Sequence, residues 1–356
     1  MPSARLSSGT NAAAWITAPK ASPFEVKEAP YPSAGPNEVI VETAVVAINP
    51  LEFKIQDTNP PIGGREIQYP TILGADLAGT IVAVGDAVAD RKVGDRVIAN
   101  ANGAQTGRPA MSAFQHFVKL EEGSTTPIPD FISFEAASVL PLACDTAAAG
   151  LFVDKQLGLS TSKLGDVSAQ PPAPGSAVLV WGGSSSVGCC AIQMAHAAGY
   201  EVYTTASKRN HQLCSSIGAE KVFDHSDPQV VEDIVIALKG KKVIGALDCI
   251  VDAEKTIPPL GQILAQTEGQ KKIAAVLNPP DVQLPEGVQA QRLSIPALRQ
   301  SNTYDIIHAW MPKALANGTL QPKPDPWVIG EGLEFVQQGV DTVRKGVSAT
   351  KIVVKL

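Results

Sequence analysis

The strongest constraint on the fold is a series of five short apolar segments, each followed by a helical pattern, in the second half of the chain. The segments are too short for helices and are bounded by turn residues, as buried strands are. Strands that alternate with helices form right-handed βαβ units and hence a parallel sheet. The expected strands are Ala177–Trp181, Glu201–Thr205, Lys221–Phe223, Ala246–Val251 and Ile273–Leu277, and the expected helices are Val187–Ala198, Arg209–Ile217, Gln229–Leu238, Ile257–Gln266 and Tyr304–Asn317.

Before about residue 130 the sequence instead consists of short β-branched runs separated by Gly, Pro and Asn, which favours a compact β domain. The runs are Val39–Val41, Val45–Ile48, Thr80–Val84 and Val97–Ala99. A chain of 356 residues is long enough for two cores. A helix from Ser133 to Leu151, interrupted at Pro141, is expected to link them. The polar, Pro-rich stretch 160–175 is expected to be an exposed loop.

Charge and cysteine usage exclude some classes of function. The net charge is -6 and no basic run occurs, so nucleic acid is not an expected partner. The segment Met1–Thr10 has one charge and no apolar core, so it predicts neither a secretory signal nor a membrane span. The 5 cysteines include no C-x-x-C pair, which favours a reduced, cytoplasmic protein.

A glycine motif lies at the first of the five expected strand-to-helix turns. Val178–Gly188 runs strand, small-residue turn, helix, the context in which backbone N–H groups and the helix dipole hold a pyrophosphate. Ser185 replaces the middle glycine, and its hydroxyl can donate to phosphate in return. The alternative, an ordinary turn, is disfavoured by the surrounding βα units. The residues expected to bind a dinucleotide are Gly182, Gly183, Ser184, Ser185, Ser186, Val187 and Gly188.

The end of the second expected strand indicates which nicotinamide cofactor is bound. It lacks the acidic residue that binds the ribose 2′-hydroxyl of NAD. Ser207, Lys208 and Arg209 follow instead, with Asn210 beside them, and a hydroxyl with two cations suits a 2′-phosphate. The alternative, a solvated Lys-Arg pair, conflicts mildly with the dipole of a helix start. The sequence therefore predicts NADPH.

Four segments in family order resemble the medium-chain dehydrogenase/reductase superfamily, in its quinone-oxidoreductase-like branch. They are Val46–Pro50, Pro70–Gly79, Val93–Val97 and Val347–Val354. The resemblance covers nearly the whole chain and includes fungal zinc-binding-dehydrogenase-like proteins of the CipB type and the trans-acting enoyl reductases of polyketide pathways. It implies a GroES-like, mostly β catalytic domain at 1–140 and 310–356, into which a Rossmann NADP-binding domain at 141–309 with a doubly wound parallel sheet is inserted. Ligands are expected in the cleft between the domains.

The metal ligands of the zinc-dependent relatives are missing. Those relatives have cysteine where Asn49 stands and Gly-His-Glu where this chain has Gly74-Ala75-Asp76. No cysteine lies between Asn100 and Met111, where a structural zinc lobe is expected. The sequence therefore predicts no metal. The histidines other than His225 are isolated in the sequence and are interpreted as structural: His116, His196, His211 and His308.

The resemblance implies four catalytic residues: Asn49, Lys54, Asp145 and Thr146. Lys54 is expected at either the nicotinamide ribose or the substrate carbonyl, and its alternative is a surface lysine. Asp145 and Thr146 fall in the segment that meets the nicotinamide. The further residues that the resemblance places at the cofactor are His225, Leu277, Asn278, Ile352 and Val353.

Zinc-independent members of the family transfer a hydride to an activated C=C bond. The leading hypothesis is therefore an NADPH-dependent enoyl or alkene reductase, acting on a small molecule or on an acyl chain carried by a polyketide synthase. One alternative is a quinone or small-enone reductase without a protein partner. Another is an NADPH-binding protein without turnover. Both a monomer and a homodimer are compatible with the sequence.

Overall fold

The computed structural model describes residues 10–62 and 64–356 and divides into two compact units. Unit 1 consists of Met1–Leu142 and Asp325–Leu356, and unit 2 is Ala143–Pro324. The chain thus leaves unit 1, forms unit 2 and returns. The return comes at residue 325 rather than near 310, because α11 (Asn302–Asn317) packs on α5 (Ser162–Gly165) and α10 (Ile295–Arg299) within unit 2.

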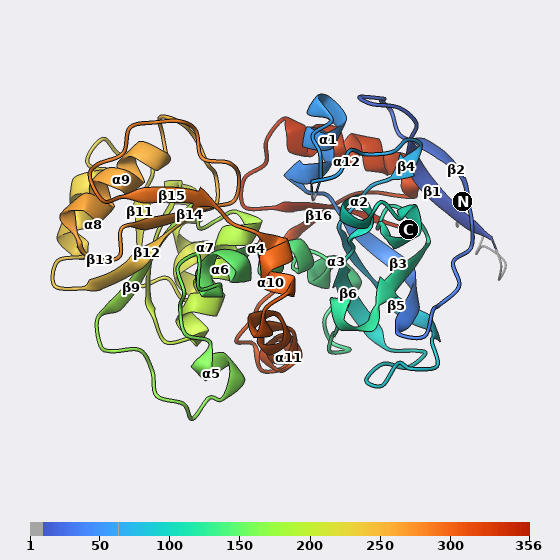
Figure 1. The fold of residues 1–356 in the computed structure, drawn as a ribbon, viewed down its shortest axis with the longest axis horizontal. Coiled ribbons are helices and arrows are strands. Elements are labelled where there is room, and N and C mark those ends of the chain that lie inside the picture. The colour runs from blue at the N-terminus through green and yellow to red at the C-terminus, as the bar shows by residue number, and fades with distance from the viewer. Residues whose placement is uncertain (1–9, 63) are drawn as a thin grey trace. The chain divides into compact units, whose positions relative to one another are not determined.

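Unit 1 contains a three-stranded sheet in the order β2-β1-β4 and a seven-stranded sheet in the order β16-β17-β3-β5-β6-β8, with β7 paired to β3 (Figure 1). The second chain segment supplies β16 and β17, and β17 pairs antiparallel with β3. The strands are β1 Asn11–Ile16, β2 Glu25–Ala29, β3 Glu38–Ala47, β4 Thr71–Ile72, β5 Asp76–Val84, β6 Arg96–Asn100, β7 Phe117–Glu121, β8 Thr125–Pro127, β16 Pro326–Glu331 and β17 Lys351–Lys355.

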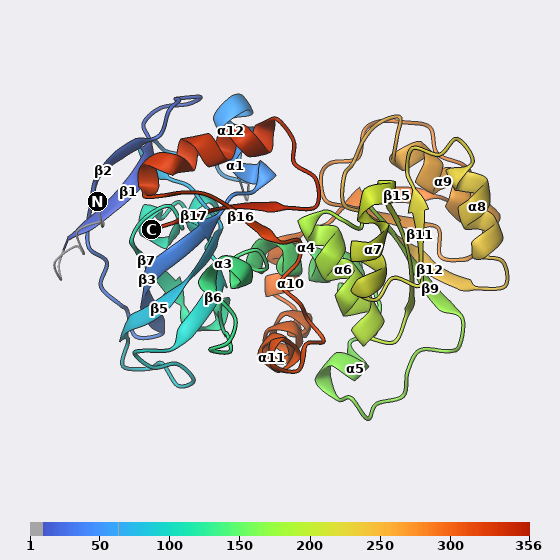
Figure 2. The same ribbon diagram turned by 180° about the vertical axis from the view of Figure 1, so that it is seen from behind.

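The two β-branched runs expected at 39–41 and 45–48 form one long strand, β3. The pairing of β3 with β5 shifts register twice, between Ile40 and Val41 and between Thr43 and Val45. These irregularities let β3 stay paired through the residues that separate the two runs. Helices α1 (Pro50–Thr58) and α12 (Val336–Arg344) pack against each other beside this sheet (Figure 2). The remaining helices of the first segment are the single turns α2 (Gly103–Thr106) and α3 (Phe134–Ala137).

Unit 2 is built on a parallel sheet in the order β11-β10-β9-β12-β14-β15, with the short β13 paired to β12. Without β13 this is the order 3-2-1-4-5-6 of doubly wound dinucleotide-binding sheets. The strands are β9 Ser176–Trp181, β10 Glu201–Ala206, β11 Lys221–Asp224, β12 Lys242–Asp248, β13 Glu268–Gly269, β14 Lys272–Ala275 and β15 Gln289–Arg292. The other helices are α4 Pro141–Phe152, α6 Ser186–Ala197, α7 His211–Ser216, α8 Val230–Ala237 and α9 Ile257–Gln266.

The sheet of unit 2 is covered on both faces. On one face Ala177, Leu179 and Trp181 of β9 join a buried cluster with apolar residues of α8 and α9. The intervening Val178 and Val180 point to the opposite face and are also fully buried. Because both faces of the sheet are buried, its strands appear in the sequence as continuous apolar runs.

The Pro-rich stretch 160–175 is not a loop throughout. It contains the short helix α5, whose Leu164 is buried, and α5 packs on α11. A single leucine among polar residues gives no periodic signal, so the expectation of a wholly exposed loop is wrong at this point. Within residues 10–62 and 64–356, none of the helices has the length and apolar character needed to cross a membrane.

The packing of α9 against the sheet predicts a stability difference between two isoleucines. Ile263 of α9 is fully buried, whereas Ile236 of α8 is 71% exposed. We expect Ile263→Ala to lower the free energy of unfolding by about 2–5 kcal/mol, because it removes buried contacts and leaves a cavity. The matched control Ile236→Ala should change it by less than about 0.5 kcal/mol. Urea unfolding monitored by circular dichroism measures both, and equal losses would contradict the assigned core.

Candidate functional site

The loop between β9 and α6 requires glycine at three positions. Gly182 has φ of 85°, a conformation that glycine adopts without strain. A Cβ on Gly183 would lie 2.1 Å from Thr204 Oγ1, and one on Gly188 would lie 2.3 Å from the carbonyl oxygen of Gly182. The glycines therefore let the start of α6 pack closely on the sheet. The first-turn N–H groups and the helix dipole of α6 fit a diphosphate at this place.

Ser185 caps α6 and shapes the loop. Its Oγ accepts a hydrogen bond from the Gly188 N–H at 3.1 Å and donates one to the Gly182 carbonyl at 2.8 Å. The hydroxyl is used in both ways within the loop, so to donate to phosphate, as the sequence predicts, it would have to leave the Gly182 carbonyl. The serine satisfies one of the N–H groups that every helix start leaves without an intrahelical partner.

The ends of the neighbouring strands β10 and β11 bring together most of the residues that the sequence assigns to a 2′-phosphate. Ser207 Oγ and His225 Nε2 lie 3.1 Å apart, and Asn210 Nδ2 donates to Ser184 Oγ at 3.3 Å. Lys208 and Arg209 are exposed beside them, with the Lys208 side chain 79% exposed. This corner therefore offers a hydroxyl, an imidazole and two cations to an anion.

Sequence reasoning missed a carboxylate at the same corner. Asp224 ends β11, and its Oδ2 lies 3.9 Å from Lys208 Nζ. Hydrogen bonds from the Ser226 backbone N–H and hydroxyl lower the pKa of Asp224, so the carboxylate is ionised at neutral pH. The end of β10 has no acidic residue, as the sequence shows. The neighbouring strand β11, however, ends in the carboxylate of Asp224, which can pair with Lys208 in place of a 2′-phosphate. The signal was available, since adjacent parallel strands end at the same edge.

The fourth and fifth strands of the parallel order complete this edge. Asp248 at the end of β12 is buried and accepts hydrogen bonds from the backbone N–H groups of Ile250 at 2.9 Å and Val251 at 3.0 Å, which turns the chain. Leu277 and Asn278 follow the end of β14, and Asn278 is exposed. Both residues lie where doubly wound sheets bind ligands, beyond the carboxyl ends of the strands.

In unit 1 a separate buried cluster contains two carboxylates, an amide and an ammonium. Asn49 Nδ2 donates to Asp76 Oδ2 at 2.9 Å, and Lys351 Nζ lies 3.2 Å from the same oxygen and also donates to Asn49 Oδ1. Glu52 accepts from the backbone N–H groups of Asn49 at 2.7 Å and Ala75 at 3.2 Å. All four side chains are at most 4% exposed as residues. Buried charges persist only when paired in this way.

Burial changes the acid–base properties of this cluster. Removal from water, and next the charge of Asp76, raises the pKa of Glu52 from 4.5 to about 7. Burial also raises the pKa of Asp76, while Lys351 and the hydrogen bonds from Asn49 and Leu142 oppose that change. Near neutral pH the cluster therefore exchanges a proton at Glu52.

The cluster changes the interpretation of several predicted residues. Both ends of the Asn49 amide are used by Asp76 and Lys351, so in this structure Asn49 orients the start of α1. Its expected catalytic role stays a prediction. Lys54, one turn into α1, is only partly buried. The side chains of Ile352 and Val353 are fully buried in β17, in the sheet interior. The expectation that these two residues contact the cofactor stays a prediction.

The residues at the position of the zinc ligands do not fit a catalytic zinc. A second cation next to the Lys351 ammonium would be repelled, and zinc requires about three protein donors. Across residues 10–62 and 64–356, no three His, Cys, Asp or Glu side chains form a group able to hold a metal ion. The 5 cysteines are buried thiols outside any disulfide, and burial raises the pKa of Cys189 well above its ordinary value.

Asp145 and Thr146 lie in α4 of unit 2 and are both buried. The Asp145 carboxylate contacts His308 and Arg299, which sequence reasoning did not connect with it. His308 was interpreted as an isolated structural histidine, and no motif links positions 163 residues apart. Only the tertiary packing of α11 and α10 on α4 reveals the group.

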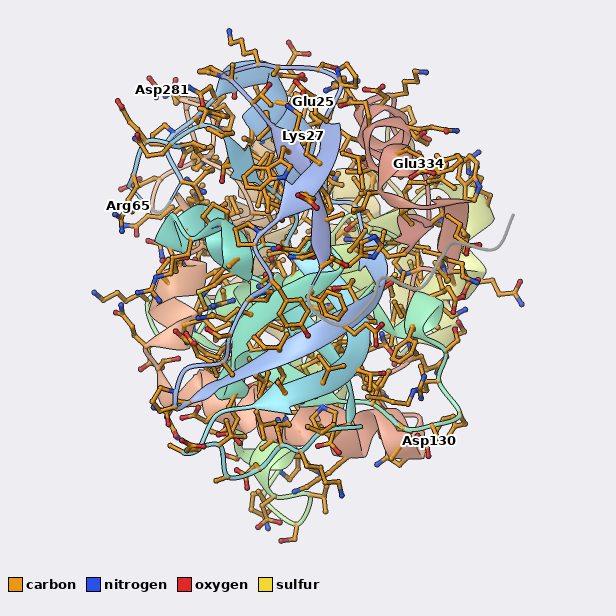
Figure 3. The ribbon with its side chains drawn as sticks, turned by 90° about the vertical axis from the view of Figure 1, so that its right-hand side faces the viewer. Glu25, Lys27, Arg65, Asp130, Asp281 and Glu334 are labelled. Atoms are coloured by element: carbon orange, nitrogen blue, oxygen red, sulfur yellow. The ribbon has the colours of Figure 1, made fainter. Side chains whose placement is uncertain are left out.

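Unit 1 also contains a cavity of about 340 Å³, large enough for part of a ligand. It is formed by the segments 65–73 and 103–109, with Ile67, Leu73 and Pro109 among the apolar lining residues and Thr71 among the polar ones. Arg65 lies at the cavity and extends outward at the surface of the molecule (Figure 3).

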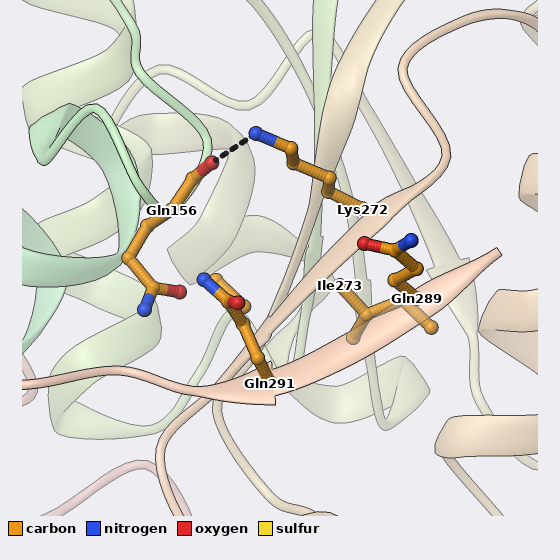
Figure 4. Close-up of a pocket in the computed structure, with 6 residues that line it drawn as sticks. Gln156, Lys272, Ile273, Gln289 and Gln291 are labelled. Atoms are coloured by element: carbon orange, nitrogen blue, oxygen red, sulfur yellow. Dashed lines mark hydrogen bonds between the residues drawn. The ribbon is translucent and has the colours of Figure 1, made fainter.

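A second hollow, in unit 2, is too small for a substrate. It measures about 10 Å³ and lies between the turn at Gln156 and the strands β14 and β15 (Figure 4). Lys272 Nζ donates to the Gln156 carbonyl at 3.3 Å across it. A space of this size holds at most one water molecule.

Two protein-family models match the chain: the alcohol dehydrogenase GroES-like domain at residues 35–130 and the zinc-binding dehydrogenase at residues 186–272. The zinc-binding alcohol dehydrogenase domain-containing protein cipB of Emericella nidulans is 39% identical over 347 residues, which cover 97% of this chain and 98% of that protein. The trans-enoyl reductase himH of Aspergillus japonicus is 36% identical over 349 residues, which cover 97% of each.

Solved structures share the fold. An alcohol dehydrogenase superfamily protein from Novosphingobium aromaticivorans matches with a TM-score of 0.76 at 23% identity, over 98% of this chain and 100% of that one. The mycobacterial protein Rv1454c, solved in complex with NADPH, matches with a TM-score of 0.70 at 20% identity, over 97% and 100%. These matches confirm the predicted fold class, a Rossmann-type parallel sheet together with a GroES-like β unit.

The raised pKa of Glu52 predicts a pH-dependent stability. Between pH 4.5 and about 7 the folded protein keeps a proton on Glu52 that the unfolded chain releases, so the contribution of this group falls as pH rises through that window. The shift corresponds to a loss on the order of 3 kcal/mol. The contribution levels off only about one pH unit above the folded pKa, where Glu52 is ionised in both states.

Glu52→Gln should remove this dependence, because an amide cannot titrate. From pH 5 to pH 8 we expect the unfolding free energy of the wild type to fall relative to that of Glu52→Gln. Chemical denaturation at several pH values measures it, with Glu66→Gln, an exposed glutamate, as the control. Parallel pH profiles for wild type and Glu52→Gln would mean that Glu52 is ionised throughout.

Proposed function

The chain belongs to the medium-chain dehydrogenase/reductase superfamily, and from this premise we propose that it is an NADPH-dependent reductase of activated carbon–carbon double bonds that works without zinc. The superfamily makes the protein an oxidoreductase, and trans-enoyl reductases are among its relatives. The observation that supports the zinc-free part of the proposal is the Lys351 ammonium between Asn49 and Asp76, where the sequence resemblance expects the ligands of zinc-dependent relatives.

NADPH, when bound, would supply a hydride to the β-carbon of an α,β-unsaturated carbonyl compound, and a proton added at the α-carbon would complete the reduction. In unit 2 the glycine loop and the first turn of α6 would hold the diphosphate, and Leu277 and Asn278 would border the nicotinamide half of the cofactor. The Thr146 hydroxyl would hydrogen-bond the nicotinamide. Ser207, Lys208, Arg209 and His225 would bind the 2′-phosphate by charge-assisted hydrogen bonds. The 3.1 Å contact of Ser207 with His225 supports this grouping.

Unit 1 would act on the acceptor. Lys54, on the helix that Asn49 and Glu52 begin, would contact the substrate carbonyl or the nicotinamide ribose, and a cation there stabilises developing negative charge on oxygen. The 340 Å³ cavity would take the acyl chain. Its lining mixes apolar residues such as Ile67 and Leu73 with polar and charged ones such as Thr71 and Arg65, which suits a chain that carries oxygen atoms.

We further propose that the acceptor is an enoyl group carried by a synthase partner of a polyketide pathway. The relative himH is a trans-enoyl reductase at 36% identity over nearly the whole chain, which supports this assignment. The buried cysteines, none of them in a disulfide, suit a reducing cytoplasmic compartment.

NADPH oxidation with a panel of acceptors tests the proposal. We expect turnover with enoyl thioesters and conjugated enones, activity that persists in chelator, and KM values that fall as the acyl chain lengthens into the cavity. A short enone such as methyl vinyl ketone and a benzoquinone serve as comparison acceptors. Preference for the quinone would indicate a quinone reductase instead. If no acceptor is turned over, the protein binds NADPH without catalysing a reduction.

The corner at β10 and β11 predicts selectivity for NADPH. Lys208→Ala/Arg209→Ala should raise the NADPH dissociation constant at least about 100-fold, because charge-assisted hydrogen bonds contribute about 1.5–3 kcal/mol each. NADH binding should change less than about threefold, since NADH lacks the phosphate. The effect should shrink at high salt, because Lys208 is largely exposed.

Titration by nicotinamide fluorescence measures both constants. Lys239→Ala/Lys242→Ala is a matched control, because it removes two exposed cations of the same unit that lie before the amino end of β12 and on its first residue. Equal losses for NADPH and NADH in the Lys208→Ala/Arg209→Ala protein, or a wild type that prefers NADH, would overturn this assignment.

A further inference from the structure

Asp145 carries a buried carboxylate at a point where three helices of unit 2 meet. Its side chain is 1% exposed, and Oδ1 lies 3.1 Å from Nε2 of His308 on α11, which donates to it when the carboxylate is ionised. Oδ2 lies 3.9 Å from Nη2 of Arg299 at the end of α10. The His308 ring packs on Tyr304, with centroids 4.0 Å apart. The carboxylate therefore joins α4 to both later helices.

Cys144, the residue before Asp145, connects the same turn of α4 to a different helix. Cys144 Sγ lies 3.5 Å from Cys190 Sγ on α6, the helix that begins at the glycine loop, and both cysteines are fully buried. Successive residues of a helix point about 100° apart. Cys144 therefore faces the cofactor-loop helix while Asp145 faces α10 and α11, and the direction of Thr146, 8% exposed, follows from these two contacts.

The group lies outside the parts of the chain that the family models match. Those parts are residues 35–130 and 186–272. Asp145, Arg299, Tyr304 and His308 all fall beyond them. The contacts of α10 and α11 with α4 therefore lie outside the two matched ranges.

We propose that Asp145 and His308 are a positioning pair that orients Thr146 toward the nicotinamide. The proposal rests on the proposed function, in which the Thr146 hydroxyl binds that ring. The buried carboxylate holds the turn of α4 rigidly because moving it would separate an ion from its partners in a medium of low polarity. Orientation of the reacting groups is what such a contact contributes to the rate of hydride transfer.

Single-turnover stopped-flow measurements of NADPH oxidation test the pair, together with the NADPH dissociation constant and the melting temperature. We expect Asp145→Asn and His308→Gln each to lower the hydride-transfer rate constant about 10–100-fold, with the dissociation constant changed less than about threefold. The double variant should lose no more than the more impaired single variant, because the two residues act as one unit. His196→Gln, an exposed histidine on α6, should match wild type.

Thr146→Val separates positioning from general destabilisation. If the pair acts through Thr146, adding His308→Gln to Thr146→Val should cause no further loss of rate, whereas independent effects would multiply. Multiplying losses, or variants with wild-type rate constants, would overturn the proposal. If Asp145→Asn does not fold, the same rate measurements are made on His308→Gln and Arg299→Lys, which change the two partners of the Asp145 carboxylate. A wild type that reduces no acceptor would instead refute the proposed function.

Discussion

The buried contact of Lys351 with Asp76 and Asn49 joins the two chain segments that make up unit 1. Lys351 begins β17, which comes from the second chain segment, whereas Asp76 begins β5 and Asn49 precedes α1 in the first. Without the ammonium, Asp76 and Glu52 would be two neighbouring carboxylates in an apolar interior, which is unfavourable. The start of α1, and with it Lys54, therefore depends on a residue supplied after unit 2.

Where local signals were strong, the fold of unit 2 could be predicted closely from the sequence. Helix α9 has the expected bounds, because prolines at 258 and 259 suit a first helical turn and the apolar spacing continues to the last turn. Strand β12 begins and ends earlier than expected, at Lys242 and Asp248. The apolar run continues to Val251, but the Asp248 carboxylate binds the next N–H groups and turns the chain, an effect that hydropathy does not register.

Only those parts of the candidate site that consist of one strand and the turn after it could be predicted from the sequence. The glycine loop and Ser207 with Lys208 are local features, and the structure places them at the edge that the strand order requires. The Asp145–His308 contact and the Lys351 cluster join distant positions, and no periodicity encodes such pairs. Ser185 shows a finer limit, because the choice between a ligand and a helix cap depends on side-chain rotation rather than on residue type.

The insertion of unit 2 into unit 1 imposes an order on folding during synthesis. Strand β3 pairs along Val45–Ala47 only with β17 on that edge, so a growing chain exposes this apolar edge until unit 2 has been made. At about 5–20 residues per second, the roughly 300 residues between the end of β3 at Ala47 and the start of β17 at Lys351 take about 15–60 s to synthesise. An unpaired apolar edge invites pairing with other chains. Unit 2, whose segment is complete before β17 is made, can fold first, and unit 1 remains the part most prone to aggregate in the nascent protein.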